Sequence, residues 1–387
     1  MPRTGWVKTT AGHRLSDHLS WGLLAKVFPP EQVDEAVRAS GRVQQRNRLM
    51  PSRVVVYYVM GLALFSQSSY EEVMETLVVG QSWSSGTTEA WAVPTKAALS
   101  KARARLGPEP LEHLFRQVAK PLAGRDEPGA FYRSWRLMSI DSADIDVPDT
   151  AANAETFGRP DGDGATPPLP QVRLVGLSAT GTRAIVDARV GGVRDPVQEL
   201  AADVLAALPS DALVLAGRGY LSPAAWTRAA ATGADLLWPV WPDVELPVLE
   251  RHDDGSYASS IHAGWPSARA PGTSGAEDIP VRVIEHVVPG GSTTGASVSR
   301  LATTITDPTQ GPADELSELY SQRWEITSAF DELRAHHLSP RVVLRSKVPD
   351  GVRQEVYGYL CVHYAIRWLM HGVQGISADR TPAPPDP

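Results

Sequence analysis

The chain has 387 residues, of which 42% are hydrophobic and 21% charged, a composition that excludes an intrinsically disordered protein and leaves room for more than one domain. Its single cysteine, Cys361, excludes a disulfide framework, and no run of about 18 apolar residues exists to span a membrane, so a cytoplasmic protein is expected. The net charge of −7 is uneven: residues 1–120 contain 15 Lys and Arg against 10 Asp and Glu, whereas residues 121–387 contain 22 against 34, so only the N-terminal part has the positive charge that nucleic acid attracts.

Residues 1–120 are expected to form a helical domain. The segment PPEQVDEAVRASG begins with proline and ends with glycine, which is the usual order of these residues around a helix. The segment PSRVVVYYVMGLALF is apolar on nearly every side, which predicts a buried helix. Ser69 and Glu72 have the spacing of a capping box at the start of the helix SSYEEVMETLVVG.

The segment PTKAALSKARARLG predicts a short basic helix. Its cations are Lys96, Lys101, Arg103 and Arg105. Together with the helix before it, this helix would form a helix-turn-helix-like pair that contacts DNA. The alternative is an ordinary helix with a solvated basic face, because four basic residues on one short helix are common. Both interpretations stay open at this point.

After the linker 121–130 the pattern changes from helices to strands. The expected strands are SWRLMSID, PQVRLVGLSA, TRAIVDARVG, ALVLAG and DLLWPV. Helices are expected at 195–207, before the fourth strand, and at 222–232, before the fifth. Three strands, a helix, a strand, a helix and a strand is the order of an RNase H-like mixed sheet.

The remaining chain predicts a β-rich insertion and then more helices. The insertion is rich in Gly, Pro and Ser and contains short β-like runs. The expected fold class is therefore α/β: a helical N-terminal domain followed by an RNase H-like mixed sheet with a β-rich insertion and C-terminal helices. The expected boundaries are 1–120 for the helical domain, 131–239 for the first part of the core, 240–310 for the insertion, 311–372 for the C-terminal helices of the core and 373–387 for a disordered tail.

The segment SIDSADIDVPDT contains the first candidate site. Its acids are Asp141, Asp144, Asp146 and Asp149, and Asp141 is expected where the first central strand ends. A carboxylate at a strand end beside other carboxylates is a usual way to bind Mg²⁺. Two such ions about 4 Å apart can clamp the attacking and leaving oxygens of a phosphodiester exchange. The alternative is a surface cluster of acids that caps turns.

The helix LYSQRWEITSAFDELRAHH makes the chain resemble the insertion-sequence-four-type DDE transposases, whose signature is Tyr, two residues, Arg, three residues, Glu, six residues, Lys. The segments VPTKAALSKARARLG, IDVPDT, FGRP and RVVLRSK also resemble the family, so the likeness extends over nearly the whole chain. The resemblance implies an RNase H-like fold, cleavage and joining of DNA with Mg²⁺ or Mn²⁺, and a homodimer on paired DNA ends. It also implies three metal-binding carboxylates, on the first strand, the fourth strand and the signature helix.

Carried over residue by residue, two of these three carboxylates are missing. Asp141 matches the first, but Gly217 stands at the second position and Thr327 at the third. Tyr320 and Arg323 match the signature, and Arg334 replaces its lysine. Asp331, one helical turn from Thr327 on the same face, is the one local stand-in, because Glu325 points about 200° away and Asp211 precedes the fourth strand. The sequence therefore predicts a degenerate site that binds no metal.

The segment after the fifth strand also departs from the family pattern. The resemblance implies basic residues in this segment. This chain has Pro239, Trp241, Pro242 and Asp243 instead. Three functions stay open: a DNA-binding transposase-family protein without strand transfer, a repurposed scaffold, or an active transposase with an altered triad. In the second, a small molecule would bind in the former active-site cleft beside Trp238 and Trp241. No cofactor is expected, and Mg²⁺ or Mn²⁺ only in the third.

Overall fold

The computed structural model describes residues 15–44, 50–85, 93–161, 167–242, 244, 246–261, 278–288, 297–321 and 344–378. The chain forms two compact units: unit 1 is Met1–Ala119 together with Leu344–Pro387, and unit 2 is Lys120–Val343. The last helix therefore belongs with the N-terminal helices, and not with the sheet as the sequence predicted. Among the helices described, none has the length and apolar character needed to cross a lipid bilayer.

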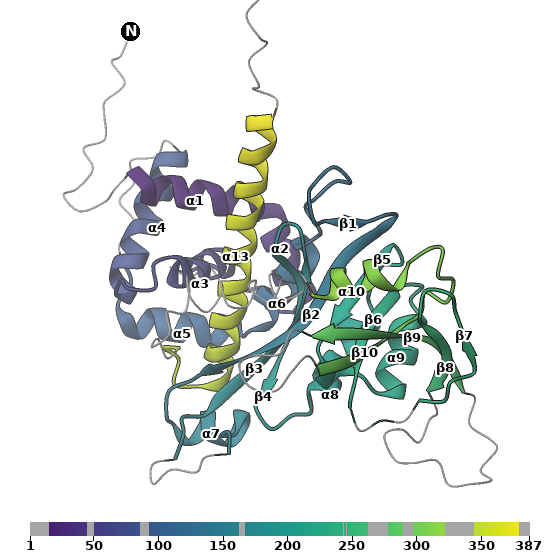
Figure 1. The fold of residues 1–387 in the computed structure, drawn as a ribbon. Helices are drawn as coiled ribbons and strands as arrows, with labels where there is room; N and C mark the ends of the chain where they lie inside the picture. The colour runs from purple at the N-terminus through teal and green to yellow at the C-terminus, as the bar shows by residue number, and fades with distance from the viewer. Residues whose placement is uncertain are drawn as a thin grey trace, which may run out of the picture. The chain divides into compact units, whose positions relative to one another are not determined.

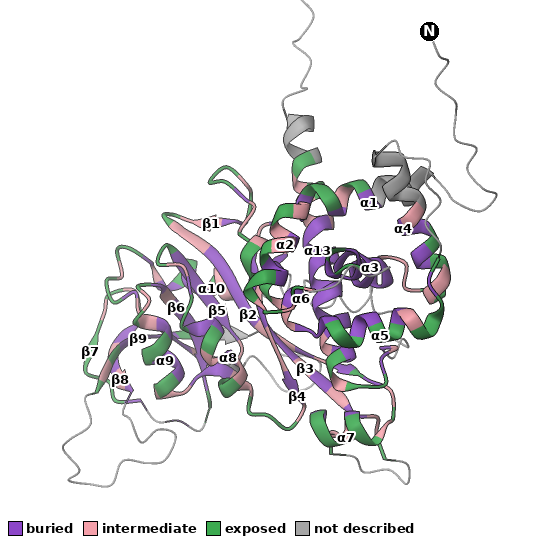
Figure 2. Ribbon diagram, turned by 180° about the vertical axis from the view of Figure 1, so that it is seen from behind, coloured by how far each residue is buried: buried purple, intermediate pink, exposed green. Residues whose placement is uncertain are grey.

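Unit 1 is helical, as expected. Its helices are α1 (Leu15–Val27), α2 (Pro30–Ala39), α3 (Ser52–Leu64), α4 (Tyr70–Ser85), α5 (Lys96–Leu106), α6 (Glu109–Val118) and α13 (Pro349–Ala378). Helix α3 packs against α2, α4, α5 and α13, and Figure 1 shows it among them. Residues 54–63 of α3 are all buried, as Figure 2 shows, which confirms the prediction from its apolar sequence.

The ends of two helices confirm the local signals in the sequence. The Ser69 backbone N–H donates to Glu72 Oε2 at 2.7 Å, and the Glu72 N–H donates to Ser69 Oγ at 3.2 Å, which is the reciprocal pairing of a capping box. Hydrogen bonding from the backbone N–H and the side chain of Ser69 lowers the pKa of the Glu72 carboxyl. Helix α2 begins at Pro30, and the chain leaves it through Gly41, whose φ of +68° is a conformation that favours glycine.

Unit 2 contains one mixed sheet with the order β4-β3-β2-β5-β6-β10-β9-β8-β7. Its first five strands are β2 (Trp135–Asp146), β3 (Gln171–Ala179), β4 (Ala184–Gly192), β5 (Ala212–Ala216) and β6 (Asp235–Val240). Strands β2, β3 and β4 are antiparallel neighbours, whereas β2, β5 and β6 are parallel. Helix α8 (Val197–Leu205) precedes β5, and α9 (Pro223–Ala230) precedes β6. This topology confirms the expected RNase H-like mixed sheet.

The β-rich segment after β6 extends the same sheet. Strand β10 (Ser297–Thr303) pairs antiparallel with β6 and continues into β9 (Ile279–Val288), β8 (Tyr257–Ile261) and β7 (Glu250–Arg251). Two smaller elements complete the described sheet region: β1 (Phe131–Tyr132), which pairs with β2, and α7 (Ala151–Phe157), which follows it. The insertion is therefore continuous with the RNase H-like core through hydrogen-bonded strands.

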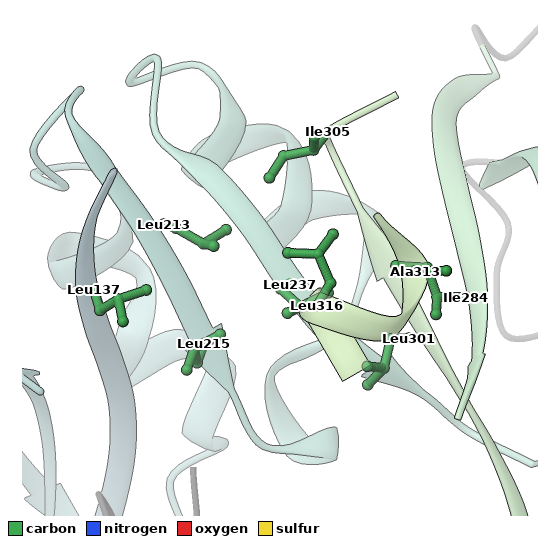
Figure 3. Packing of buried hydrophobic residues seen from close by; sticks show 9 residues of the cluster. All are labelled: Leu137, Leu213, Leu215, Leu237, Ile284, Leu301, Ile305, Ala313 and Leu316. Atoms are coloured by element: carbon green, nitrogen blue, oxygen red, sulfur yellow. The ribbon is translucent and has the colours of Figure 1, made fainter. Parts of the chain in front are cut away.

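Helix α10 (Ala313–Ser321) covers one face of this sheet. Its Ala313 and Leu316 pack with the cluster in Figure 3, whose other members are Leu137, Leu213, Leu215, Leu237, Ile284, Leu301 and Ile305. The opposite face contains Trp238, whose ring meets that of Trp226 from α9 edge-on, with centroids 5.4 Å apart. Because side chains alternate between faces along a strand, Leu237 lies on the α10 face of the sheet and its neighbour Trp238 lies on the α9 face.

Candidate active site

The structure brings positions 141 and 217 together on the α10 face of the sheet. Strands β2 and β5 are in parallel register from Leu137 with Leu213 to Ile140 with Ala216. The next residues, Asp141 and Gly217, follow directly where this pairing ends. Both lie four residues beyond the leucine pair that packs against α10, so the alternation of a strand places them on that same face. The two positions expected to share a metal ion are therefore neighbours.

Asp141 has glycine on both sides of it. Its registered partner on β3 is Gly176, and Gly217 follows β5 on the other side. Its Oδ1 accepts a hydrogen bond from the Ser142 N–H at 2.8 Å. The sequence predicted that Asp141 ends its strand, and this was wrong: β2 continues to Asp146 in its antiparallel pairing with β3. What ends at Ile140 is the pairing with β5.

The other acids of the SIDSADIDVPDT segment have structural partners. Asp144 accepts two hydrogen bonds from Arg173, from Nε at 2.8 Å and Nη2 at 2.9 Å, and this pairing raises the pKa of the arginine. Asp146 accepts from Gln171 Nε2 at 2.8 Å, and Asp149 pairs with Arg159. Sequence reasoning missed Arg173, whose signal is its position directly opposite Asp144 in the antiparallel register. Among the four acids, Asp141 is the one next to position 217.

Tyr320 of the signature reaches the same end of β5. Its hydroxyl donates a hydrogen bond to the carbonyl oxygen of Ala216 at 3.1 Å, and its ring packs against the α10-facing cluster. It therefore contacts the residue immediately before Gly217. Arg323, Thr327 and Arg334, together with Glu325 and Asp331, lie outside the described residues, as does Asp243.

The residues present at this position do not fit a two-metal site. Carboxylate oxygens are the ligands that Mg²⁺ needs, and glycine supplies none from its side chain. Within the described ranges, no three His, Cys, Asp or Glu side chains gather closely enough to hold a metal ion. Of the carboxylate positions that the resemblance implies, the described part of the site contains Asp141 and Gly217, and only Asp141 has a carboxylate.

The tryptophans expected to line a cleft are in different environments. Trp238 is fully buried, and its Nε1 donates to the carbonyl oxygen of Val214 at 3.1 Å, so it belongs to the core and offers no surface to a ligand. Trp241 is 43% exposed. Arg300 from β10 fixes the backbone there, because its Nη2 donates to the carbonyls of Trp241, Pro242 and Val244 at 3.3, 3.0 and 2.7 Å. Pro239 is buried within β6.

The basic helix α5 contains three exposed cations and one buried one. Arg103 is 9% exposed, and its guanidinium donates to Ser346 Oγ at 3.0 Å, Gly351 O at 3.2 Å, Gln354 Oε1 at 3.2 Å and Glu355 Oε1 at 3.4 Å. Arg103 therefore connects α5 to α13 inside unit 1 and is withdrawn from the DNA-binding candidates. Lys96, Lys101 and Arg105 are exposed, and no carboxylate of the described residues forms an ion pair with them.

Comparison with known proteins finds similarity to transposases. Residues 18–116 match the family model described as the N-terminal domain of insertion element 4 transposases. The chain is 25% identical over 349 residues to transposase InsG for insertion sequence element IS4 from Escherichia coli strain K12, covering 90% of this chain and 76% of that protein. It is 23% identical over 253 residues to the putative transposase InsZ from the same organism, covering 65% and 82%. A structural search found the piggyBac transposase synaptic complex with hairpin DNA, with a TM-score of 0.42, 11% identity and coverage of 93% of this chain and 76% of that one.

Proposed function

From the premise that the chain belongs to the insertion-sequence-four-type transposases, we propose that it binds DNA through its helical unit and has lost metal-dependent strand cleavage and transfer. The observation that supports the loss is the β2–β5 register, in which Gly217 follows directly beside Asp141. The resemblance places the second metal ligand at position 217, and that position lies on the same sheet face as Asp141. A hydrogen atom occupies it instead.

The chemistry explains why one missing ligand matters. In a two-metal site the ions activate the attacking oxygen and stabilise the leaving oxygen, and a carboxylate shared between them sets their spacing. An isolated carboxylate binds a hydrated Mg²⁺ only weakly, because this ion gives up its water reluctantly. Thr327 at the signature glutamate position would add a neutral hydroxyl, which is a poor replacement for a charged ligand. We infer that the fold is stable without divalent ions.

Charge supports DNA binding by unit 1. This unit contains 19 Lys and Arg against 14 Asp and Glu, a net charge of +5, whereas unit 2 contains 18 against 30, a net charge of −12. Lys101 and Arg105 are four residues apart on α5 and therefore share a face, while Arg103 points about 200° from Lys101. Exposed cations on one helix face are suited to phosphate contacts, whose strength falls with salt. The expected homodimer stays a prediction.

The decisive experiment is a cleavage assay on the purified full chain. Supercoiled plasmid DNA is incubated with the natural protein and with Asp141→Asn, in Mg²⁺ and in Mn²⁺. We expect no difference between the two proteins, because Asp141 alone cannot organise the reaction. Metal-dependent nicking by the natural chain that Asp141→Asn abolishes would refute the proposed loss.

DNA binding is measured separately, so that each half of the proposal can fail alone. Fluorescence anisotropy of a labelled duplex with the natural chain, over a range of salt, tests the binding. We expect an affinity that decreases linearly with salt on a log–log plot. An absence of binding at low salt would refute the DNA-binding half and leave the cleavage result unaffected.

A further inference from the structure

Helix α10, which leads into the signature segment, is held on the sheet at its N-terminal end. Its N-terminal residue Ala313 donates its backbone N–H to Asp254 Oδ2 at 3.0 Å. Asp254 is 59 residues earlier in the chain, in the turn between β7 and β8. A carboxylate at a helix N-terminus satisfies an N–H that has no partner within the helix and interacts favourably with the helix dipole. The cap of α10 thus comes from the β-rich segment.

A fully buried arginine holds this cap in place. Arg282 of β9 is 0% exposed and pairs with Asp254 through Nη2. Its Nε donates to Ser256 Oγ at 2.7 Å, and its Nη1 donates to the carbonyls of Gly311 at 2.7 Å and Ile305 at 3.4 Å. Gly311 lies two residues before α10. One guanidinium therefore joins the capping turn to the chain that enters the helix.

The turn itself is shaped for this contact. Asp254 Oδ1 accepts from the Ser256 hydroxyl at 2.5 Å and from the Ser256 N–H at 3.1 Å, which leaves Oδ2 to Arg282 and Ala313. Gly255 has a φ of +83°, a conformation that favours glycine. The carboxylate therefore has a fixed orientation, and both of its oxygens are used.

A second contact to α10 differs in its burial. Glu315 accepts from the Tyr132 hydroxyl at 2.6 Å and from Arg133 Nη2 at 3.0 Å, but the side chains of this ion pair are 39% and 45% exposed. Exposed pairs contribute little because water screens them, whereas removing one partner of a buried pair leaves an uncompensated charge. In the Asp254–Arg282 pair the side chains are 21% and 1% exposed, so this pair is more strongly shielded from water than the Glu315–Arg133 pair and is the stronger candidate for fixing α10.

We propose that Asp254 and Arg282 are positioning residues: they fix α10 so that Tyr320, at its other end, meets the carboxyl end of β5 beside Asp141 and Gly217. The β-rich segment is then a structural part of the site, because it supplies the cap of the helix that enters the signature. This holds for the described site whether or not the chain retains cleavage activity.

Hydrogen exchange measured by mass spectrometry on the full chain tests the proposal. The variants are Asp254→Ala, which removes the cap and the charge, and Asp254→Asn, which keeps an acceptor oxygen. Asp253→Asn, an exposed neighbour with the same loss of charge, is the matched control. In Asp254→Ala we expect exchange of the α10 amides to accelerate by about tenfold or more, with a smaller increase in Asp254→Asn. The amides of β3 and the Asp253→Asn protein should behave as in the natural chain.

A double-mutant cycle separates positioning from general stability. Tyr320→Phe removes the hydrogen bond to Ala216 at the far end of α10. If Asp254 positions the helix, the effect of Tyr320→Phe on α10 exchange should largely disappear in the Asp254→Asn background. If the two substitutions change the α10 exchange rate by factors that simply multiply in the double variant, within about twofold, the two sites are independent and the proposal is overturned, because free-energy effects of independent distant sites add. Equal acceleration in α10 and β3, or none in α10, would also overturn it.

Discussion

Replacing Arg103 by alanine tests whether this arginine is structural, as its burial indicates, or functional, as the basic sequence around it suggested. The guanidinium lies between α5 and α13, and the side chains of Arg103 and Glu355 are only 10% and 6% exposed. In Arg103→Ala the Glu355 carboxylate would keep its contacts to Ser346 and to the Arg345 N–H but lose its positive partner. It would remain a buried charge without compensation.

The expected cost follows from that burial. Breaking a buried ion pair by removing one partner costs about 3–5 kcal/mol. For a unit of this size, each kcal/mol lowers the melting temperature by about 2–4 °C, so we expect a decrease of about 6–20 °C. The control is Arg105→Ala, two residues further on the same helix but exposed, which should change stability by less than about 0.5 kcal/mol.

The chain contains its own reporter for this measurement. Cys361 lies fully buried in α13, where burial raises the pKa of its thiol, so it reacts only when unit 1 opens. Thiol labelling under native conditions should therefore be faster in Arg103→Ala by about 100-fold or more, and unchanged in Arg105→Ala. Equal labelling rates and equal melting temperatures in the two variants would contradict the structural role and return Arg103 to the DNA-binding candidates.

Three further predictions address DNA, metal and pH. Neutralising Lys96, Lys101 and Arg105 together should flatten the salt dependence of DNA binding by about 0.9 in the log–log slope for each phosphate that the variant no longer neutralises, and an unchanged slope would exclude α5 as the contact surface. By calorimetry, Mn²⁺ should not raise the melting temperature of the natural chain. It should raise the melting temperature of the double variant Gly217→Asp, Thr327→Glu, because ion binding at 100 times the dissociation constant adds about 2.7 kcal/mol of stability. Tight Mn²⁺ binding by the natural chain that is lost in Asp141→Asn would contradict this prediction. Burial raises the pKa of Asp254, but hydrogen bonds from Ser256 and Ala313 and the charge of Arg282 outweigh it, so its pKa lies below 3.8. The stability that Asp254 contributes should therefore be present above its unfolded pKa and lost as the pH falls through the lower folded pKa. Unfolding curves of the natural chain and Asp254→Asn should converge in acid, and a difference in stability that does not shrink as the pH falls would refute the assignment.

The predictions from sequence were successful where the signal is local. The apolar sequences of β5, β6 and α3 predicted that these elements are buried, and they are. The capping box at Ser69 could be predicted because it depends on two residues only three positions apart. The burial of Arg103 also has a local signal: it shares the face of Leu99 and Leu106, three to four residues away in each direction. A count of the cations in the segment ignores which face of the helix each one occupies, so it did not predict the burial of Arg103.

Other features depend on contacts that no local pattern encodes. Arg103 meets Gln354 across 251 residues, so the membership of α13 in unit 1 could not follow from the sequence of either segment. The pairing of Asp144 with Arg173 depends on the register of β2 and β3, which are separated in the sequence by α7. Trp238 was expected to line a cleft, but it lies within β6, and its position on the α9 face places it in the core.

The sheet around Asp141 and Gly217 is well packed and regular in its strand register. Strand β5 is buried along its whole length, and the register with β2 continues to the residue before Gly217. The buried Arg282 has an anionic partner and three further acceptors, although an unpaired charge at 0% exposure would be strongly destabilising. In the described part of the chain β5 is buried and Arg282 is paired while position 217 is glycine, so the packing of this sheet does not require a carboxylate at position 217.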